Sequence, residues 1–113
     1  MTVWKVASLA LQASIVLESL AIVLVDGHDW HFVGYASCNC EGRVSSKIEH
    51  FDLEARTGRT ASGRIYRLEG PPGSDPDARY VFERWCAISR VKQFEEITEQ
   101  VLAGSLAPPD DRQ

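Results

Sequence analysis

The segment GPPGSDPDA, residues 70–78, constrains the fold of this chain more than any other stretch. Proline has no backbone N–H to give to a β-ladder, so the glycines and adjacent prolines at its start end any sheet that precedes it. Asp75 followed by Pro76 is typical of a helix N-cap and a first helical residue. We therefore expect strands before this segment and a helix after it.

A β-hairpin is expected around Asp26 and Gly27, because this dipeptide is a favoured hairpin turn. The runs on either side, LAIVLV at 20–25 and WHFVGYAS at 30–37, are rich in the β-branched and aromatic residues that strands prefer. Residues 5–18 fit a strand period and a helical period equally well, so their structure stays open.

Two further short strands are expected in KIEHFDL, residues 47–53, and in GRIYRLEG, residues 63–70. Gly58 lies between them and Gly63 opens the second, and we interpret these glycines as a turn and a strand entry. Together with the hairpin, these segments predict an antiparallel meander of four to five strands.

One or two C-terminal helices are expected to pack on that sheet, which makes the fold class α+β. A second helical segment, with Ile97 and Val101 facing inward, would end at Gly104 as its C′ residue. We predict a single α+β domain over residues 1–104 and a frayed tail over residues 105–113. Apolar residues that recur at helical spacing in these segments are Ala78, Val81, Phe82, Trp85, Ile88 and Phe94.

The composition favours a reduced, cytoplasmic protein. Three cysteines are an odd number, and Cys38 and Cys40 are too close in sequence for an unstrained disulfide bond. Gln12 and Glu18 lie inside the apolar stretch from residue 6 to residue 25, and a central carboxylate is costly in lipid, so no membrane insertion is expected. The net charge of −4 does not demand a nucleic-acid partner.

The stretch HDWHFVGYASCNCEG, residues 28–42, carries ligand types that suit zinc: His28, His31, Cys38 and Cys40. On a strand the two cysteines stand about 6.5–7 Å apart, and the histidines lie about 20 Å from them, so one four-ligand site is not expected. We predict no metal and no cofactor, and we interpret the thiols as structural. Whether Cys38 and Cys40 meet a third ligand such as Cys86 or His50 stays open.

Acid–base pairs lie close together around residues 26–31 and again at Glu49, His50 and Asp52. No recognisable nucleophile motif accompanies them. We therefore predict that the protein is not an enzyme, with a zinc- or thiol-dependent enzyme as one alternative.

Residues 42–69 form a basic stretch, with six bases and four acids, between two acidic ends of the chain. Arginines around small and hydroxyl residues suit an anion, and an aromatic ring between arginines can stack on a base. Trp30, which opens a strand directly after a turn, is a candidate contact for a protein partner. The predicted binding residues are Trp30, Arg59, Arg64, Tyr66 and Arg67.

Residues 42–85 resemble small uncharacterised bacterial proteins of plasmids, prophages and genomic islands. The resemblance rests on Ser45 and Ser46 before Ile48, on the segment 60–68, and on the GPPG that precedes an aromatic helix. It implies a mobile-element setting, in which small acidic proteins bind host or phage macromolecules. Some of these proteins inhibit defence nucleases, as anti-CRISPR proteins do.

The sequence therefore predicts a small non-enzymatic binding or regulatory protein that acts on a macromolecular partner, with an anti-defence inhibitor as one form of it. A protein partner is favoured, and a nucleic-acid or phosphate-binding module that uses the arginine-rich strand is the alternative. A helical packing face and an open sheet edge are compatible with a homodimer.

Overall fold

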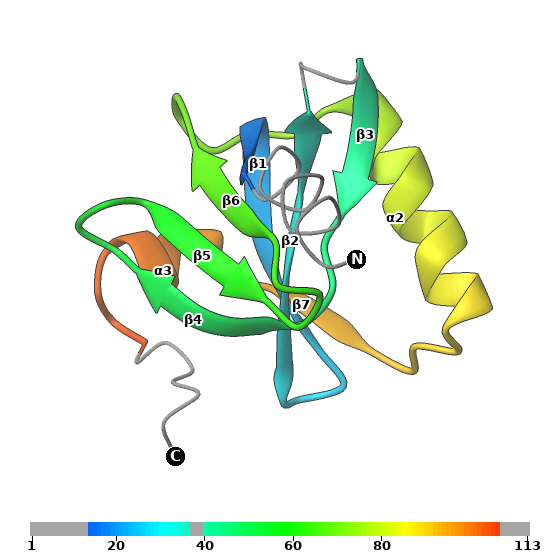
Figure 1. Cartoon of the computed structure of the whole chain (residues 1–113). Coiled ribbons are helices and arrows are strands. Elements are labelled where there is room, and N and C mark those ends of the chain that lie inside the picture. The colour runs from blue at the N-terminus through cyan, green and yellow to red at the C-terminus, as the bar shows by residue number, and fades with distance from the viewer. Residues whose placement is uncertain (1–13, 37–39, 107–113) are drawn as a thin grey trace, which may run out of the picture.

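The structure is a computed structural model, and it describes residues 14–36 and 40–106 (Figure 1). None of the helices within these ranges is long and apolar enough to cross a membrane. The elements in chain order are β1 (Ser14–Val25), β2 (Asp29–Ala36), β3 (Glu41–Val44), β4 (Ile48–Asp52), β5 (Thr57–Thr60), β6 (Ile65–Leu68), α2 (Pro76–Ile88), β7 (Phe94–Glu96) and α3 (Thr98–Leu102).

The strands form one mixed sheet of seven strands in the order β3-β2-β1-β6-β5-β4, with β7 paired to β1 outside that path. The α+β class is confirmed, but the meander of four to five antiparallel strands is wrong. β1 and β6 pair in parallel, with Ser14 opposite Ile65 and Leu17 opposite Leu68. A parallel pair needs a long connection between its strands, and here that connection contains the four strands β2 to β5.

β1 bends at an irregularity in its pairing with β2, between Glu18 and Ala21. Ser19 has a φ of 48°, which lies in the left-handed region, and such a bulge moves the following side chains to the opposite face. Leu17 before the bend and Leu20 after it therefore both point into the same core. A flat strand with strict alternation would have turned Leu20 out of it.

The second edge of β1 has a hydrogen-bond partner along most of its length. Between β6 at one end and β7 at the other, the Leu17, Leu20 and Ile22 carbonyls accept from the backbone N–H groups of Glu69, Gly73 and Ile97, at 2.8–3.0 Å. The Ile22 N–H donates to Thr98 Oγ1 at 2.9 Å. The long strand thus holds both the GPPG loop and the start of α3 in place.

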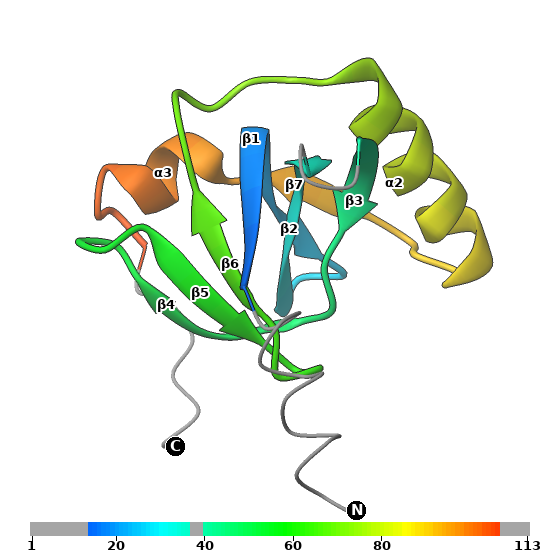
Figure 2. The ribbon, with the colours of Figure 1, turned by 45° about the horizontal axis from the view of Figure 1, so that its top comes forward.

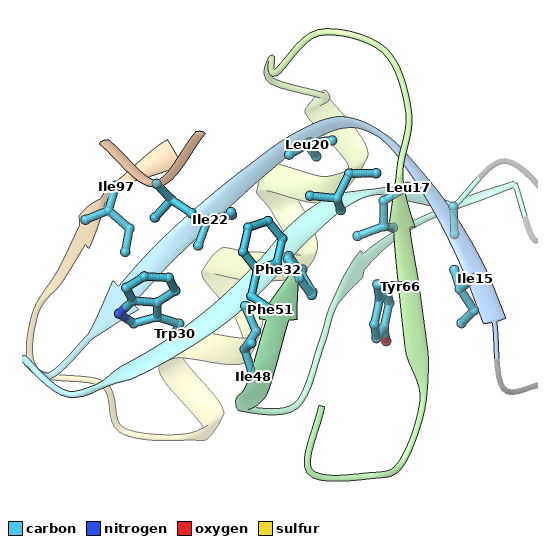
Figure 3. Packing of buried hydrophobic residues seen from close by; sticks show 13 residues of the cluster. Ile15, Leu17, Leu20, Ile22, Trp30, Phe32, Ile48, Phe51, Tyr66 and Ile97 are labelled. Carbon is cyan, nitrogen blue, oxygen red and sulfur yellow. The ribbon is translucent and has the colours of Figure 1, made fainter. Parts of the chain in front are cut away.

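Both faces of β1 and β2 are buried, each in a separate cluster. The larger cluster lies between β1, β2, β4, β6 and α3, with Phe32 and Phe51 near its centre and Trp30 and Tyr66 towards its two ends (Figure 3). The smaller cluster lies under α2, where Ala78 and Phe82 pack against the other face of β1 and β2. Figure 2 shows α2 beside β3, well separated from α3.

Several local predictions are confirmed. The hairpin turn has positive φ at both Asp26 and Gly27. Asp75 caps α2 by accepting a hydrogen bond from the Ala78 N–H at 3.0 Å, with Pro76 as the first helical residue. Gly104, with a φ of 78°, follows the C-cap of α3 as the C′ residue.

Three local expectations are wrong or differ in detail. The stretch around Gly58 is strand β5 and not a turn, and a glycine stands there because the Phe32 ring leaves no room for a side chain on the inner face. Phe94 lies in β7 and not in a helix, and it is exposed, although Ile97 and Val101 are buried as expected. Ile88, at the last turn of α2, is 75% exposed and does not belong to the smaller cluster.

The prediction of one domain over residues 1–104 and a frayed tail over residues 105–113 stays a prediction. Residues 5–13 of the ambiguous stretch and most of the tail lie outside the described residues. Residues 14–18 of that stretch belong to β1.

The substitution Gly58→Ala is expected to destabilise the fold by about 1–3 kcal/mol, because an added Cβ would lie 2.4 Å from Phe32 Cζ in the centre of the core. Gly73→Ala is the matched control, since its Cβ would meet only Ser19, at an ordinary distance of 3.6 Å. Urea unfolding followed by circular dichroism measures both. Equal midpoints for the two variants would contradict this packing.

Candidate functional site

Two of the predicted binding residues are buried, so the structure does not present them to a partner. Trp30 is 9% exposed and Tyr66 is 2% exposed, and both belong to the larger core cluster. The Tyr66 hydroxyl accepts a hydrogen bond from Arg43 Nε at 3.2 Å, which satisfies its polar atom at the edge of the core. Both rings act in packing here, not in base stacking or partner contact.

The three predicted arginines lie on or beside β5 and β6. Arg59 pairs in register with Ile65 and Arg67 pairs with Thr57, so both arginines lie on the face of these strands that points away from the core. Arg67 Nη2 lies 3.7 Å from Glu69 Oε2, and Arg64 is half-buried just before β6. One acid, Glu69, therefore accompanies the bases on this surface.

The histidines of the HDWH stretch do not converge. His28 is exposed in the turn, with Nδ1 at 3.1 Å from Asp29 Oδ1. His31 is buried, and its Nδ1 donates to the Ser45 carbonyl at 2.9 Å while its ring packs on Trp85 at 4.7 Å between centroids. Burial lowers the pKa of His31 below its ordinary 6.5. The hydrogen bond to Ser45 and the charge of Asp29 raise this pKa, but their effect is smaller than that of burial.

The carboxylate of Asp26 links two segments of the backbone. Its Oδ1 accepts from the backbone N–H of Lys92 at 2.9 Å and of Gln93 at 3.0 Å, which ties the hairpin turn to the start of β7. The hydrogen bonds from Gln93 and then Lys92 lower the pKa of this carboxyl group. The acids and histidines around the turn therefore do not form one acid–base cluster, because Asp26, His28 and His31 each have a different partner.

The two described thiols lie apart. Cys40 is exposed at the start of β3, and Cys86 is half-buried near the end of α2, where burial raises the pKa of its thiol. Gly42, two residues after Cys40, faces Ala78 of α2. Cys86 lies eight residues after Ala78, which is about 12 Å along the helix at 1.5 Å per residue. Cys38 lies outside the described residues, and within those residues no three side chains of His, Cys, Asp or Glu gather to hold a metal ion.

A groove of about 340 Å³ lies on the face of β1 opposite the larger core. Its floor is the outer face of β1 and β2, α2 forms one side, β7 forms the other, and residues 73–75 close one end. The apolar lining residues are Ala21, Val23, Val33, Ala78, Phe82 and Phe94. This volume falls in the range of known ligand sites, and an apolar floor with a few polar groups is their usual chemistry.

Phe94 is the feature of the groove that packing alone does not explain. It is 56% exposed, while its ring meets Phe82 edge to face at 4.9 Å between centroids. Exposed aromatic rings on a preformed apolar surface are typical of contact sites.

The rim of the groove is acidic. The charged side chains that line it are Asp75, Arg79, Glu83 and Glu96, three acids and one base. Glu95 is also exposed in β7 and adds negative charge on the opposite face of that strand. A positively charged partner segment would therefore be favoured.

The chain matches no known family model, and neither a curated protein nor a solved structure is significantly similar to it. The resemblance of residues 42–85 to mobile-element proteins is therefore not tested by these comparisons.

The groove was not predictable from the sequence, because its walls come from distant parts of the chain. One signal was present: Phe94 is followed by two glutamates, and a short apolar–acidic run after a helix is compatible with an edge strand. The inward helical spacing of Phe94, Ile97 and Val101 concealed it.

The free energy of unfolding should fall when the pH is lowered from about 7 to about 5, because His31 resists protonation in the folded state and accepts a proton readily once unfolded. This stability is complete above the ordinary pKa of 6.5 and is lost as the pH falls towards the lower folded value. His31→Gln should flatten this dependence, and the exposed control His28→Gln should retain it. Urea unfolding at several pH values measures the three slopes, and equal slopes would contradict the assignment.

Proposed function

We propose that this protein is a small non-enzymatic binding protein, and that it holds a protein partner in the groove between α2 and β7. The observation that carries the proposal is Phe94, an aromatic side chain left exposed at the side of an apolar groove. Macromolecular contacts usually depend on a few such side chains near a desolvated pocket.

The chemistry of the groove supports binding more than catalysis. The residues that line it, all within the described ranges, include no histidine and no cysteine. Asp75 already accepts the N-cap hydrogen bond of α2, so its carboxylate has a structural use. Hydrolysis usually requires a general base next to a nucleophile, and among the described residues no hydrogen bond joins the lining hydroxyl groups of Ser19 and Ser74 to a carboxylate.

The wider setting is proposed from the resemblance of residues 42–85. We propose that the partner is a host or phage protein, with a defence nuclease as one candidate. Genes next to this one that encode defence or anti-defence proteins would support this setting, and a locus of unrelated housekeeping genes would argue against it.

Phe94→Ala should weaken partner binding by about 2 kcal/mol, roughly 30-fold, because truncation of a central aromatic contact has about this effect. A tagged protein recovers its partner from the native host, and titration of the purified pair then measures affinity. Tyr80→Ala is the control, since Tyr80 is an exposed aromatic residue of α2 that does not line the groove. Unchanged affinity for Phe94→Ala, with loss for Tyr80→Ala, would move the contact to the outer face of α2.

A nucleic-acid or phosphate-binding module is the second candidate function, and the shared outer face of Arg59 and Arg67 favours it. If it holds, binding to a DNA or RNA oligonucleotide at low salt should weaken steeply as salt is added. Arg67→Ala should weaken binding and lower the slope of log K against log salt by about one. Arg79→Ala removes the same charge at the groove and serves as control. Absence of binding at about 50 mM salt would remove this candidate.

A further inference from the structure

We infer that the partner segment that contacts the groove is extended and basic, and that it adds a strand to the outer edge of β7, next to the groove. This inference rests on the proposed function and names the kind of partner segment that the site accepts. Its basis is the direction of the β7 backbone groups together with the charge of the surrounding side chains.

The backbone of β7 leaves one edge open. Gln93 O accepts from the Asp26 N–H at 2.9 Å and the Ile97 N–H donates to Ile22 O at 2.8 Å, with Glu95 opposite Leu24 between them. Because the N–H and C=O of one strand residue point to the same edge and alternate along the strand, those of Phe94 and Glu96 point away from β1.

These outward groups have no hydrogen-bond partner among the described residues. Two donors and two acceptors are therefore available to an added strand, at the usual spacing of about 4.8 Å. Addition of an extended peptide to a sheet edge is a common mode of recognition, in which main-chain bonds give affinity and side-chain pockets give specificity.

The same geometry connects the edge to the groove. Phe94 and Glu96 both line the groove, so their side chains lie on the face of β7 that looks towards it, and Glu95 lies on the other face. A strand added beside β7 would place its alternate side chains next to Phe94 and Glu96. One of them would extend the apolar surface of the groove.

Charge determines which segment fits. Cross-strand neighbours of opposite charge stabilise a sheet and like charges destabilise it. An added antiparallel strand would therefore carry a basic residue opposite Glu96, a basic residue opposite Glu95 and an apolar residue opposite Phe94. The expected order is basic-basic-apolar, and it is reversed for a parallel segment.

A second copy of this chain fits the edge poorly. If two β7 strands paired antiparallel about their centres, Glu95 would lie opposite Glu95 and each Glu96 opposite a Phe94. The direct contact of like charges disfavours that pairing.

The test uses short synthetic peptides with the central sequence Lys-Lys-Ile or Ile-Lys-Lys, labelled for fluorescence anisotropy and titrated with the full chain. One of them should bind, and the Glu-Glu-Ile peptide should bind at least tenfold more weakly. For Lys-Lys-Ile, N-methylation of the first lysine or of the isoleucine should abolish binding, because these amides face β7. N-methylation of the middle lysine should be tolerated, since its amide points away.

Protein variants test the same contacts from the other side. Glu95→Lys should weaken peptide binding about fivefold or more, whereas Glu54→Lys, the same charge change in an exposed turn, should leave it unchanged. Glu96→Pro removes an outward N–H without touching the ladder to β1, so it should bind more weakly than Glu96→Ala. Thermal unfolding verifies that each variant is folded.

The outcomes separate this inference from the proposed function. If partner binding depends on Phe94 but neither peptide binds and Glu96→Pro equals Glu96→Ala, the strand-addition inference is overturned and the groove function stands. If partner binding is indifferent to Phe94, the groove function itself fails. A homodimer in sedimentation that Glu96→Pro dissociates would assign the edge to a second copy and overturn the inference.

Discussion

The bend of β1 at Ser19 is the constraint on which the rest of the structure depends. It allows one strand to pair with β6 over its first residues and with β7 over its last, two partners that belong to different parts of the chain. It also shifts the side-chain alternation, so that the apolar residues before and after the bend enter one core. Without the bend, Leu17 and Leu20 would point to opposite faces of the strand, and only one of them would reach this core.

The centre of the sheet is buried on both faces. The inner face packs on the aromatic cluster around Phe32, and the outer face packs on Ala78 and Phe82 of α2. α2 covers β2 and β3 but not the whole outer face of β1. The groove is the part of that face which the helix leaves uncovered.

Local features of this fold were predictable from sequence because they depend on a few neighbouring residues. The turn at Asp26 and Gly27, the cap at Asp75 and the C′ position of Gly104 each follow from backbone conformations that those residues favour. The parallel pairing of β1 with β6 was not predictable, because no local pattern specifies the partner of a strand. The sequence favours a turn at Gly58, because glycine is common in turns. Only the position of the Phe32 ring, far away in the sequence, explains why a glycine stands inside a strand.

The candidate site was less predictable than the fold. Trp30 and Tyr66 were reasonable contact residues by type, but the register of β2 and β6 turns both side chains into the core. Phe94 had the opposite outcome, since its apolar character suggested burial and its place on an edge strand exposes it. Residue type gives a tendency, whereas strand register determines which face a side chain reaches.

The carboxylate of Asp26 has a consequence for how readily β7 can accept a strand. It fixes the beginning of β7 through two backbone N–H groups, while Thr98 Oγ1, which accepts from Ile22 N and contacts Glu96 Oε2 at 3.1 Å, fixes the end. A three-residue strand held at both ends is already arranged for pairing, so docking need not order it. Because the pKa of Asp26 is lowered, its carboxylate stays charged at pH values at which an ordinary aspartate is already protonated. The edge of β7 therefore stays pre-organised at those pH values.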